Sequence, residues 1–259
     1  MHPVLYRWDS HILYWYSALI WLGLLVGLAY AVWQGARADY HHTQILDGAL
    51  WLLLGGLLGA RLAYVLPNWA DYGGRPAALL GLWGGGYIYQ GGLVGGLLAL
   101  WVYTLIAPLS FPRLVDLGAP AVALAQGIGW AGAWVHGANY GLVLRSTFSM
   151  WLPDLYGVYG PRLPVQMLGC ALGLLLFLGL HRLRRSRPRP GTVALIYLLC
   201  NGLGHFLLEF ARADEAFYIG LLRWTQVAEL AEAGLAVVIL WYLRPKAQSQ
   251  RVRTGEESR

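Results

Sequence analysis

The chain has 259 residues, of which 58% are hydrophobic and only 12% are charged, and its mean hydropathy is +0.49. Soluble domains carry about 25% charged residues, so this composition excludes an ordinary soluble protein. The net charge of +6 is better explained by membrane topology and attraction to anionic lipid than by nucleic-acid binding. We therefore expect an all-α polytopic membrane protein that has the membrane, and no nucleic acid, as a partner.

Seven apolar runs are long enough to cross a bilayer, for which about 20 residues are needed. In chain order they cover residues 12–33, 45–66, 87–107, 114–135, 164–180, 192–210 and 221–243. The third run starts irregularly, because residues 81–96, GLWGGGYIYQGGLVGG, are half glycine. Glycine inside a helix costs about 1 kcal/mol relative to alanine. The glycines indicate either close helix packing or backbone that lines an outward headgroup pocket.

Two basic segments predict the orientation of these spans. Residues 181–190, HRLRRSRPRP, and the tail after Leu243 together hold ten of the nineteen Lys and Arg residues. Basic segments favour the cytoplasmic side, and two spans separate these two. Counting back through seven spans places the N-terminus outside and the C-terminus in the cytoplasm. We expect one transmembrane domain over residues 1–243, with a short outward loop region at 136–163 and a disordered basic cytoplasmic tail at 244–259.

Polar residues near the outward ends of the spans are the first candidates for a functional site. Ionisable groups inside a membrane usually face the bundle interior or a water-filled cavity. We expect Asp116 to cap a helix or to reach the interface, and Glu229 and Glu232 to pair with Arg223 or with a donor on another span. Arginine and backbone N–H groups at the outward end would suit an anionic headgroup. The candidates at that end are Arg61, Gln90, His136, Glu209 and Arg212.

Seven segments occur in the order, and near the spacing, of prolipoprotein diacylglyceryl transferases of bacterial inner membranes, which this chain therefore resembles over roughly residues 13–240. The segments are LYWYSALIWLGLLVG, LLGARLAYVL, LWGGGYIYQGGLVGG, VDLGAPAVALAQGIGWAGAWVHGANYG, GPRLPVQML, LLEFARADEAFYIG and RWTQVAEL. The resemblance implies transfer of the diacylglyceryl group of phosphatidylglycerol to the lipobox cysteine of a preprolipoprotein. It implies a cavity open sideways to lipid on the outer side of the cytoplasmic membrane. Phosphatidylglycerol or a related anionic lipid and a lipobox peptide would then be the partners.

The resemblance also assigns site residues. Arg212, in EFARADE, stands at an arginine position of the family and suits phosphate binding. His136 stands at an asparagine position of a family motif, where it would supply the imidazole that is lost at Gln90. The predicted catalytic residues are His136, Arg212 and Gln90. The predicted substrate-binding residues are Arg61, Tyr16, Gly91, Gly92, Asn139 and Gly137. No metal-ligand spacing or cofactor motif is evident, so we expect neither metal nor cofactor.

The chain departs from the family pattern at polar positions. Gln90 replaces a histidine, Trp130 and His205 replace arginines, and Ala138 and Gly169 replace glutamates. Two functions stay open: a divergent, active diacylglyceryl transferase, and a non-catalytic lipid-binding or structural membrane subunit with the same fold. A related transferase with another lipid donor or acceptor is a third. Convergence of Arg212, His136 and Gln90 on one cavity would favour an enzyme, and a cavity filled by Trp130 would favour the subunit.

Overall fold

The computed structural model describes residues 4–8, 11–72, 74 and 86–243. Within them, seven helices are long and apolar enough to cross a membrane. They are α1 Trp15–Ala36, α2 His42–Val65, α5 Tyr89–Ile106, α6 Phe111–His136, α7 Val165–Arg185, α8 Thr192–Glu209 and α9 Trp224–Tyr242. The prediction of an all-α polytopic membrane protein with seven spans is confirmed. The predicted tail at 244–259 and residues 81–85 of the glycine stretch lie outside the described residues.

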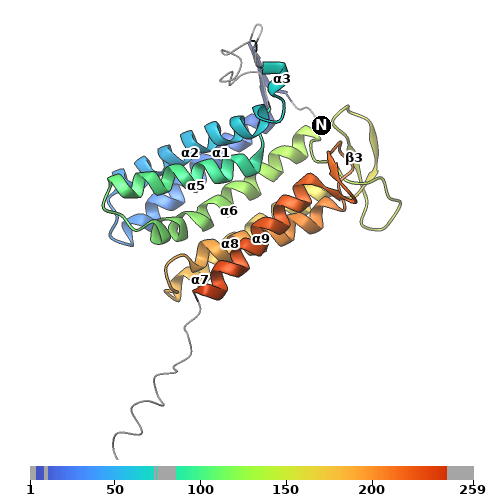
Figure 1. Cartoon of the computed structure of the whole chain (residues 1–259). Helices are drawn as coiled ribbons and strands as arrows, with labels where there is room; N and C mark the ends of the chain where they lie inside the picture. Colours follow the sequence, from blue (N-terminus) through green and yellow to red (C-terminus); the bar gives the residue numbers. More distant parts are fainter. Residues whose placement is uncertain (1–3, 9–10, 73, 75–85, 244–259) are drawn as a thin grey trace, which may run out of the picture.

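Helix α6 lies at the centre of the bundle (Figure 1). On one side are α1, α2 and α5, and on the other are α7, α8 and α9. The closest packing joins α2 to α5, α1 to α6, α6 to α7 and α8 to α9, whereas little or no contact joins α5 to α9 among the described residues. The bundle thus has two groups of helices that meet along α6 and diverge between α5 and α9.

Glycine allows α2 and α5 to approach closely. A Cβ atom added at Gly91 would lie 2.3 Å from Cβ of Ala63 and 2.5 Å from the backbone oxygen of Gly59, and one at Gly95 would lie 2.4 Å from the oxygen of Gly55. Small residues spaced in this way pack membrane helices against each other. The second half of the glycine stretch therefore forms a helix contact.

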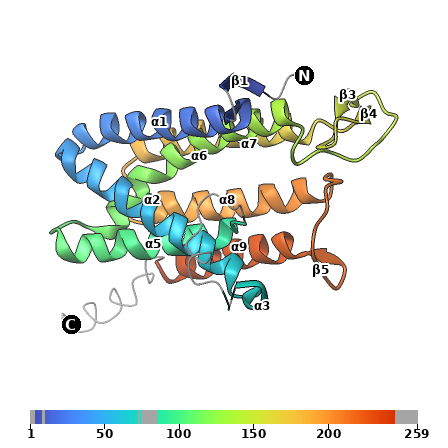
Figure 2. The same ribbon diagram turned by 90° about the horizontal axis from the view of Figure 1, so that it is seen from above.

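Three short hairpins that the sequence did not predict lie at the end of the bundle where α6 ends and α7 begins (Figure 2). Isolated bridges also pair Gly141 with Arg212 and Val143 with Arg162, and so tie the loop after α6 to the segment after α8. The hairpins and a short helix are β1 Val4–Trp8 with β2 His11–Tyr14, β3 Met150–Pro153 with β4 Tyr159–Arg162, β5 Tyr218–Ile219 with β6 Leu222–Arg223, and α3 Trp69–Tyr72.

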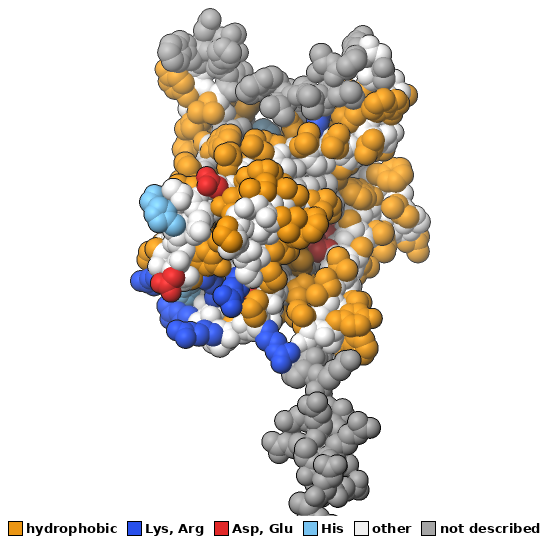
Figure 3. Space-filling view, turned by 60° about the vertical axis from the view of Figure 1, so that its left-hand side comes forward, with side chains coloured by type: hydrophobic (Ala, Val, Ile, Leu, Met, Phe, Trp, Pro, Cys, Tyr) orange, Lys and Arg blue, Asp and Glu red, His pale blue; other side chains and the backbone are white. Residues whose placement is uncertain are grey.

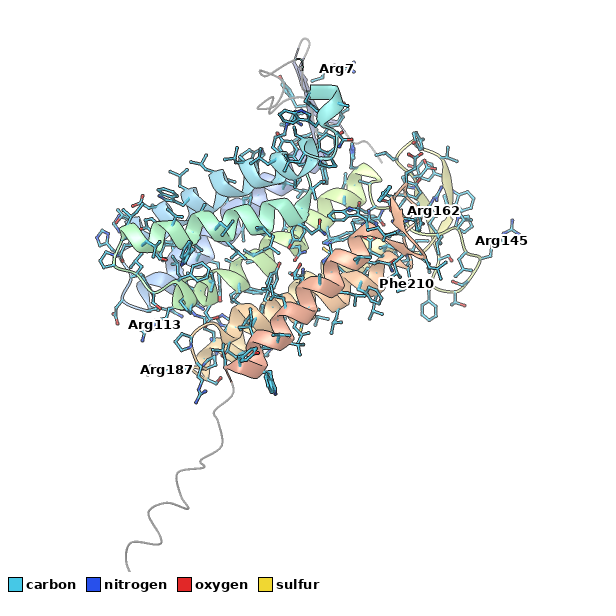
Figure 4. All side chains as sticks on the ribbon, in the orientation of Figure 1. Arg7, Arg113, Arg145, Arg162, Arg187 and Phe210 are labelled. Carbon is cyan, nitrogen blue, oxygen red and sulfur yellow. The ribbon has the colours of Figure 1, made fainter. Side chains whose placement is uncertain are left out.

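The opposite end of the bundle carries basic side chains. Figure 4 places Arg113 and Arg187 at this end and Arg145 at the end with the hairpins. In the view of Figure 3, Lys and Arg side chains gather at one end of a largely hydrophobic surface. Asp116 caps α8 here, because its Oδ2 accepts from the Gly191 N–H at 2.7 Å and its Oδ1 from the Ala194 N–H at 2.8 Å. The expected capping role of Asp116 is confirmed.

Candidate functional site

A cavity of about 640 Å³ lies among α1, α5, α6, α8 and α9, and it is partly open. Its lining includes residues from the first turns of α1, α5 and α9 and from the last turns of α6 and α8, so it extends to the end of the bundle that carries the hairpins. Apart from tyrosines and tryptophans, the polar residues of its lining are Gln90, Gln126, Asn139, Asn201, His205, Glu209, Arg212, Thr225, Glu229 and Glu232.

The structure brings four of the predicted site residues to this cavity and leaves the others outside its lining. Tyr16, Gln90, Asn139 and Arg212 line it. Gly92 lines a second, smaller cavity of about 360 Å³. The remaining predicted residues, which line neither cavity, are His136, Arg61, Gly91 and Gly137.

Arg212 is held by acidic and amide groups at the mouth of the cavity. Its Nε and Nη2 donate to Asp214, its Nη1 donates to Glu209, and its Nη2 also donates to Oδ1 of Asn139 at 3.0 Å. Arg223 donates to Oε2 of Glu209 at 3.1 Å and to Oδ1 of Asp214 at 3.3 Å. Two arginines and two carboxylates thus form a closed network.

The network shifts the pKa values of Arg212 and Asp214, which lie in the loop after α8. Burial alone lowers the pKa of Arg212, but the hydrogen bonds and charges of Asp214 and Glu209 outweigh burial, so the pKa rises. Burial alone raises the pKa of Asp214, but Arg212 and Arg223 outweigh it, so this pKa falls below its ordinary value of 3.8. Both groups are therefore charged near neutral pH, and the charge of Arg212 is largely balanced by its neighbours.

Glu229 and Glu232 do not pair with Arg223, so that part of the expectation is wrong. The alternative, a donor on another span, holds for Glu232, whose side chain is hydrogen-bonded to Asn201 of α8. Arg223 precedes the first residue of α9, and Glu229, six positions later, lies about 9 Å further along the helix axis. Its guanidinium instead contacts Glu209 and Asp214. In the described part of the chain, Oε2 of Glu229 and Oε1 of Glu232 are buried and have no hydrogen-bond partner.

His136 is not in the lining of the cavity, but its ring contacts Tyr16, which is. Its imidazole stacks on the Tyr16 ring at a centroid distance of 5.4 Å and meets the edge of Tyr14 at 5.7 Å. Its Nδ1 is buried without a hydrogen-bond partner among the described residues. The catalytic role of His136 stays a prediction.

Arg61 is buried beneath the segment that leads into α5. Its Nη1 donates to the Gly86 oxygen at 3.2 Å. Its guanidinium lies 5.9 Å, 5.2 Å and 6.0 Å from the ring centroids of Tyr64, Tyr72 and Tyr87. Because Tyr87 lines the cavity, Arg61 can position this part of the wall without facing the cavity itself.

Gly137 and Asn139 form the turn that brings the chain from α6 to Arg212. Gly137 ends α6 with a φ of 83°, a conformation that favours glycine. A Cβ atom there would lie 2.7 Å from the Asp154 oxygen. Asn139 also has a positive φ, 51°, and its side chain reaches Arg212.

Trp130 lies in the cavity wall and leaves the cavity open. Its ring covers Gly169, where an added Cβ atom would lie 2.3 Å from Cδ2 of Trp130, and it stacks on His205 at 5.5 Å. The resemblance expects an arginine at 130 and a glutamate at 169. The chain has a large ring and glycine at these positions, and the ring fills space that a side chain at 169 would need.

An inner polar wall, made of Gln126, Asn201, Glu229 and Glu232, lines the cavity away from Arg212. The Tyr197 hydroxyl donates to Oε1 of Gln126 at 3.1 Å, and the Gln126 amide nitrogen donates to His205 Nε2 at 3.0 Å. Sequence reasoning did not assign this wall to the site. The spacing of Gln226, Glu229 and Glu232 at i+3 indicates one helix face and was the available signal.

Comparison with known proteins agrees with the resemblance. A sequence model of the family "Prolipoprotein diacylglyceryl transferase" matches residues 3–242. Proteins named phosphatidylglycerol–prolipoprotein diacylglyceryl transferase are similar to this chain. The one from Bacillus licheniformis is 28% identical, over 96% of this chain and 94% of its own length. Those from Gloeobacter violaceus and Streptococcus agalactiae are each 29% identical, over 96% and 94% of this chain and 95% and 96% of their own lengths. The chain therefore belongs to the prolipoprotein diacylglyceryl transferase family.

Proposed function

We propose that this protein is an enzyme of the bacterial cytoplasmic membrane that transfers the diacylglyceryl group of phosphatidylglycerol to the cysteine thiol of a prolipoprotein lipobox. The family match over residues 3–242 carries this proposal. The names of the relatives give this activity, and this chain covers more than nine-tenths of their length in each case above. The partly open cavity adds a place for the donor lipid.

The cavity is proposed to open on the outer side of the membrane. In this orientation the N-terminus is outside, and the end of the bundle with Arg113 and Arg187 lies at the cytoplasm. The mouth of the cavity, with Arg212 and Asn139, then lies at the level of the outer headgroups.

The reaction forms one bond and breaks one bond. The thiol gives up its proton, its sulfur bonds to the glyceryl carbon, and the bond from that carbon to the phosphate oxygen breaks, so that glycerol phosphate leaves with the electron pair. Arg212 uses four of its five N–H groups within the protein, and the fifth is proposed to contact the phosphate. We assign headgroup binding to Gln90 and Asn139, and proton acceptance to His136 behind Tyr16.

The other predicted residues are proposed to act through shape. Arg61 and Gly137 position the two segments that border the cavity, and Gly91 and Gly92 hold α5 against α2. The smaller cavity has an almost wholly apolar lining and shares Tyr89, Val122 and Tyr197 with the larger one. We assign it to an acyl chain of the donor.

The test uses the purified full chain with phosphatidylglycerol and a lipobox peptide, and it follows the thioether product by its mass. We expect product from the wild type and a loss of about 10- to 100-fold in Arg212→Ala, because a charge-assisted contact contributes about 1.5–3 kcal/mol. The matched control is Arg145→Ala, at an exposed arginine of the loop after α6, which we expect to keep full activity.

Two outcomes would redirect the assignment. No product with phosphatidylglycerol still bound would favour the non-catalytic lipid-binding subunit. Full activity in His136→Gln would remove His136 as the proton acceptor, and His205 would then be the imidazole to test, because it lines the cavity directly.

A further inference from the structure

The cavity holds more acidic groups than basic ones. Among the described residues of its lining, Arg212 is the one arginine or lysine, whereas Glu209, Glu229 and Glu232 carry carboxyl groups. Arg212 is already paired with Glu209 and with Asp214 outside the lining. In the described structure, Glu229 and Glu232 form no ion pair with any arginine or lysine.

The acidic groups without an ion pair belong to the inner polar wall, where Glu229 is buried and Glu232 is half-buried. Glu229 is 8% exposed and Asn201 only 2% exposed. Oε2 of Glu229, Oε1 of Glu232 and Oδ1 of Asn201 have no hydrogen-bond partner among the described residues. All three side chains line the cavity, and their free atoms are acceptors. A ligand with several N–H donors satisfies them, and a positive charge on it would favour the ionised form of the buried carboxyl groups.

Aromatic rings surround the same space. Tyr89 is next to Tyr197 and to Asn201, and Asn201 is next to Glu232, so rings and acceptors lie side by side. Aromatic faces attract ammonium groups, and carboxylates attract them by charge. The aromatic residues of the lining are Tyr16, Tyr87, Tyr89, Trp130, Tyr197 and Trp224.

We infer that the inner polar wall is a binding site for an ammonium group that enters as the headgroup of a membrane phospholipid, of the phosphatidylethanolamine class. Glu232 lies eight residues into α9 from Trp224, about 12 Å along the helix axis. The apolar side chains of Ile20 and Leu24 in the same cavity suit an acyl chain. The ammonium group contacts Glu229, Glu232 and Asn201. This goes beyond the proposed donor, because the glycerol headgroup of phosphatidylglycerol carries no cation.

A lipid-retention experiment tests the inference without any acceptor peptide, so its result is separate from that of the transfer assay. The purified full chain is equilibrated with mixed micelles of equal phosphatidylethanolamine and phosphatidylglycerol, and the retained lipids are measured by native mass spectrometry. We expect the wild type to retain phosphatidylethanolamine beside phosphatidylglycerol. The double variant Glu229→Gln, Glu232→Gln keeps the side-chain size, and we expect it to retain about tenfold less phosphatidylethanolamine, with retention of phosphatidylglycerol unchanged.

The control variant is Glu215→Gln, at an exposed glutamate of the loop after α8, which we expect to behave as the wild type. Equal thermal midpoints establish that the variants are folded, and the single variant Glu232→Gln replaces the double variant if the latter does not fold. Displacement of the lipid by millimolar free ethanolamine would support the ammonium site. It would also identify a free amine, and not a lipid headgroup, as the ligand. No retained phosphatidylethanolamine in the wild type, or unchanged retention of it in the glutamine variants, would overturn the inference.

Discussion

Asp214 joins the two arginines that border the cavity, and its side chain contacts both Arg212 and Arg223. These contacts lower the pKa of the Asp214 carboxyl below 3.8 in the folded protein despite its burial. A lowered pKa stabilises the fold above the pKa of the unfolded chain, and this stabilisation is lost as the pH falls through the folded pKa. The loop that carries Arg212 therefore depends on an ionised Asp214.

Asp214→Asn should lower the free energy of unfolding by about 1–3 kcal/mol at neutral pH, because it removes charge-assisted hydrogen bonds to two arginines. The difference in unfolding free energy between the wild type and the variant should disappear as the pH falls below about 4, because the Asp214 carboxyl then becomes protonated. Thermal unfolding in detergent across this pH range measures both effects. Glu215→Gln is the control, and identical pH profiles for the wild type and Asp214→Asn would contradict the assignment.

The residues of the site were predictable to different degrees. Tyr16, Asn139 and Arg212 stand in recognisable motifs, so the sequence placed them at the cavity before the structure did. The sequence did not place Glu229 and Glu232 at the cavity. The partner of a buried carboxylate depends on where a loop directs the competing arginine. Arg223 is directed into the loop network by Glu209 and Asp214, which no sequence spacing reveals.

At the scale of elements, length and hydropathy defined the seven helices within a few residues, because a bilayer requires long apolar runs. The hairpins were missed because strands of two to five residues are too short to develop a clear alternating pattern. The function of Gly91 also needed the structure, since small-residue spacing is compatible with both helix packing and a lipid pocket.

Gly91→Ala should destabilise the protein by about 1–3 kcal/mol, because the new methyl group overlaps the backbone of Gly59 and forces α2 and α5 apart. Gly234→Ala is the matched control, since an added Cβ atom there has no heavy atom within 4 Å among the described residues. The control should gain about 0.5–1 kcal/mol from helix propensity. Unfolding in detergent measures both, and equal effects of the two substitutions would argue against the helix contact.

At the scale of the whole molecule, the orientation rests on the basic residues at one end of the bundle. Phe148, in the loop before β3, is 81% exposed, and Phe148→Cys should react with a membrane-impermeant thiol reagent in intact spheroplasts. Arg187→Cys, at the opposite end (Figure 4), should react only after the membrane is opened. The reverse pattern would place the cavity mouth in the cytoplasm. The wild type, whose two cysteines, Cys170 and Cys200, both lie within helices, reports the background.

The sparse contact between α5 and α9 bears on how substrate reaches a site of this kind. A lipid that passes between two helices arrives by diffusion in the plane of the bilayer, without crossing water. The effective concentration of the donor is then its mole fraction in the membrane, which does not change with the total amount of lipid. Turnover should therefore respond to dilution of the donor by other lipids and remain constant when membrane area grows at fixed composition, so lipid synthesis would set the rate of this reaction through membrane composition.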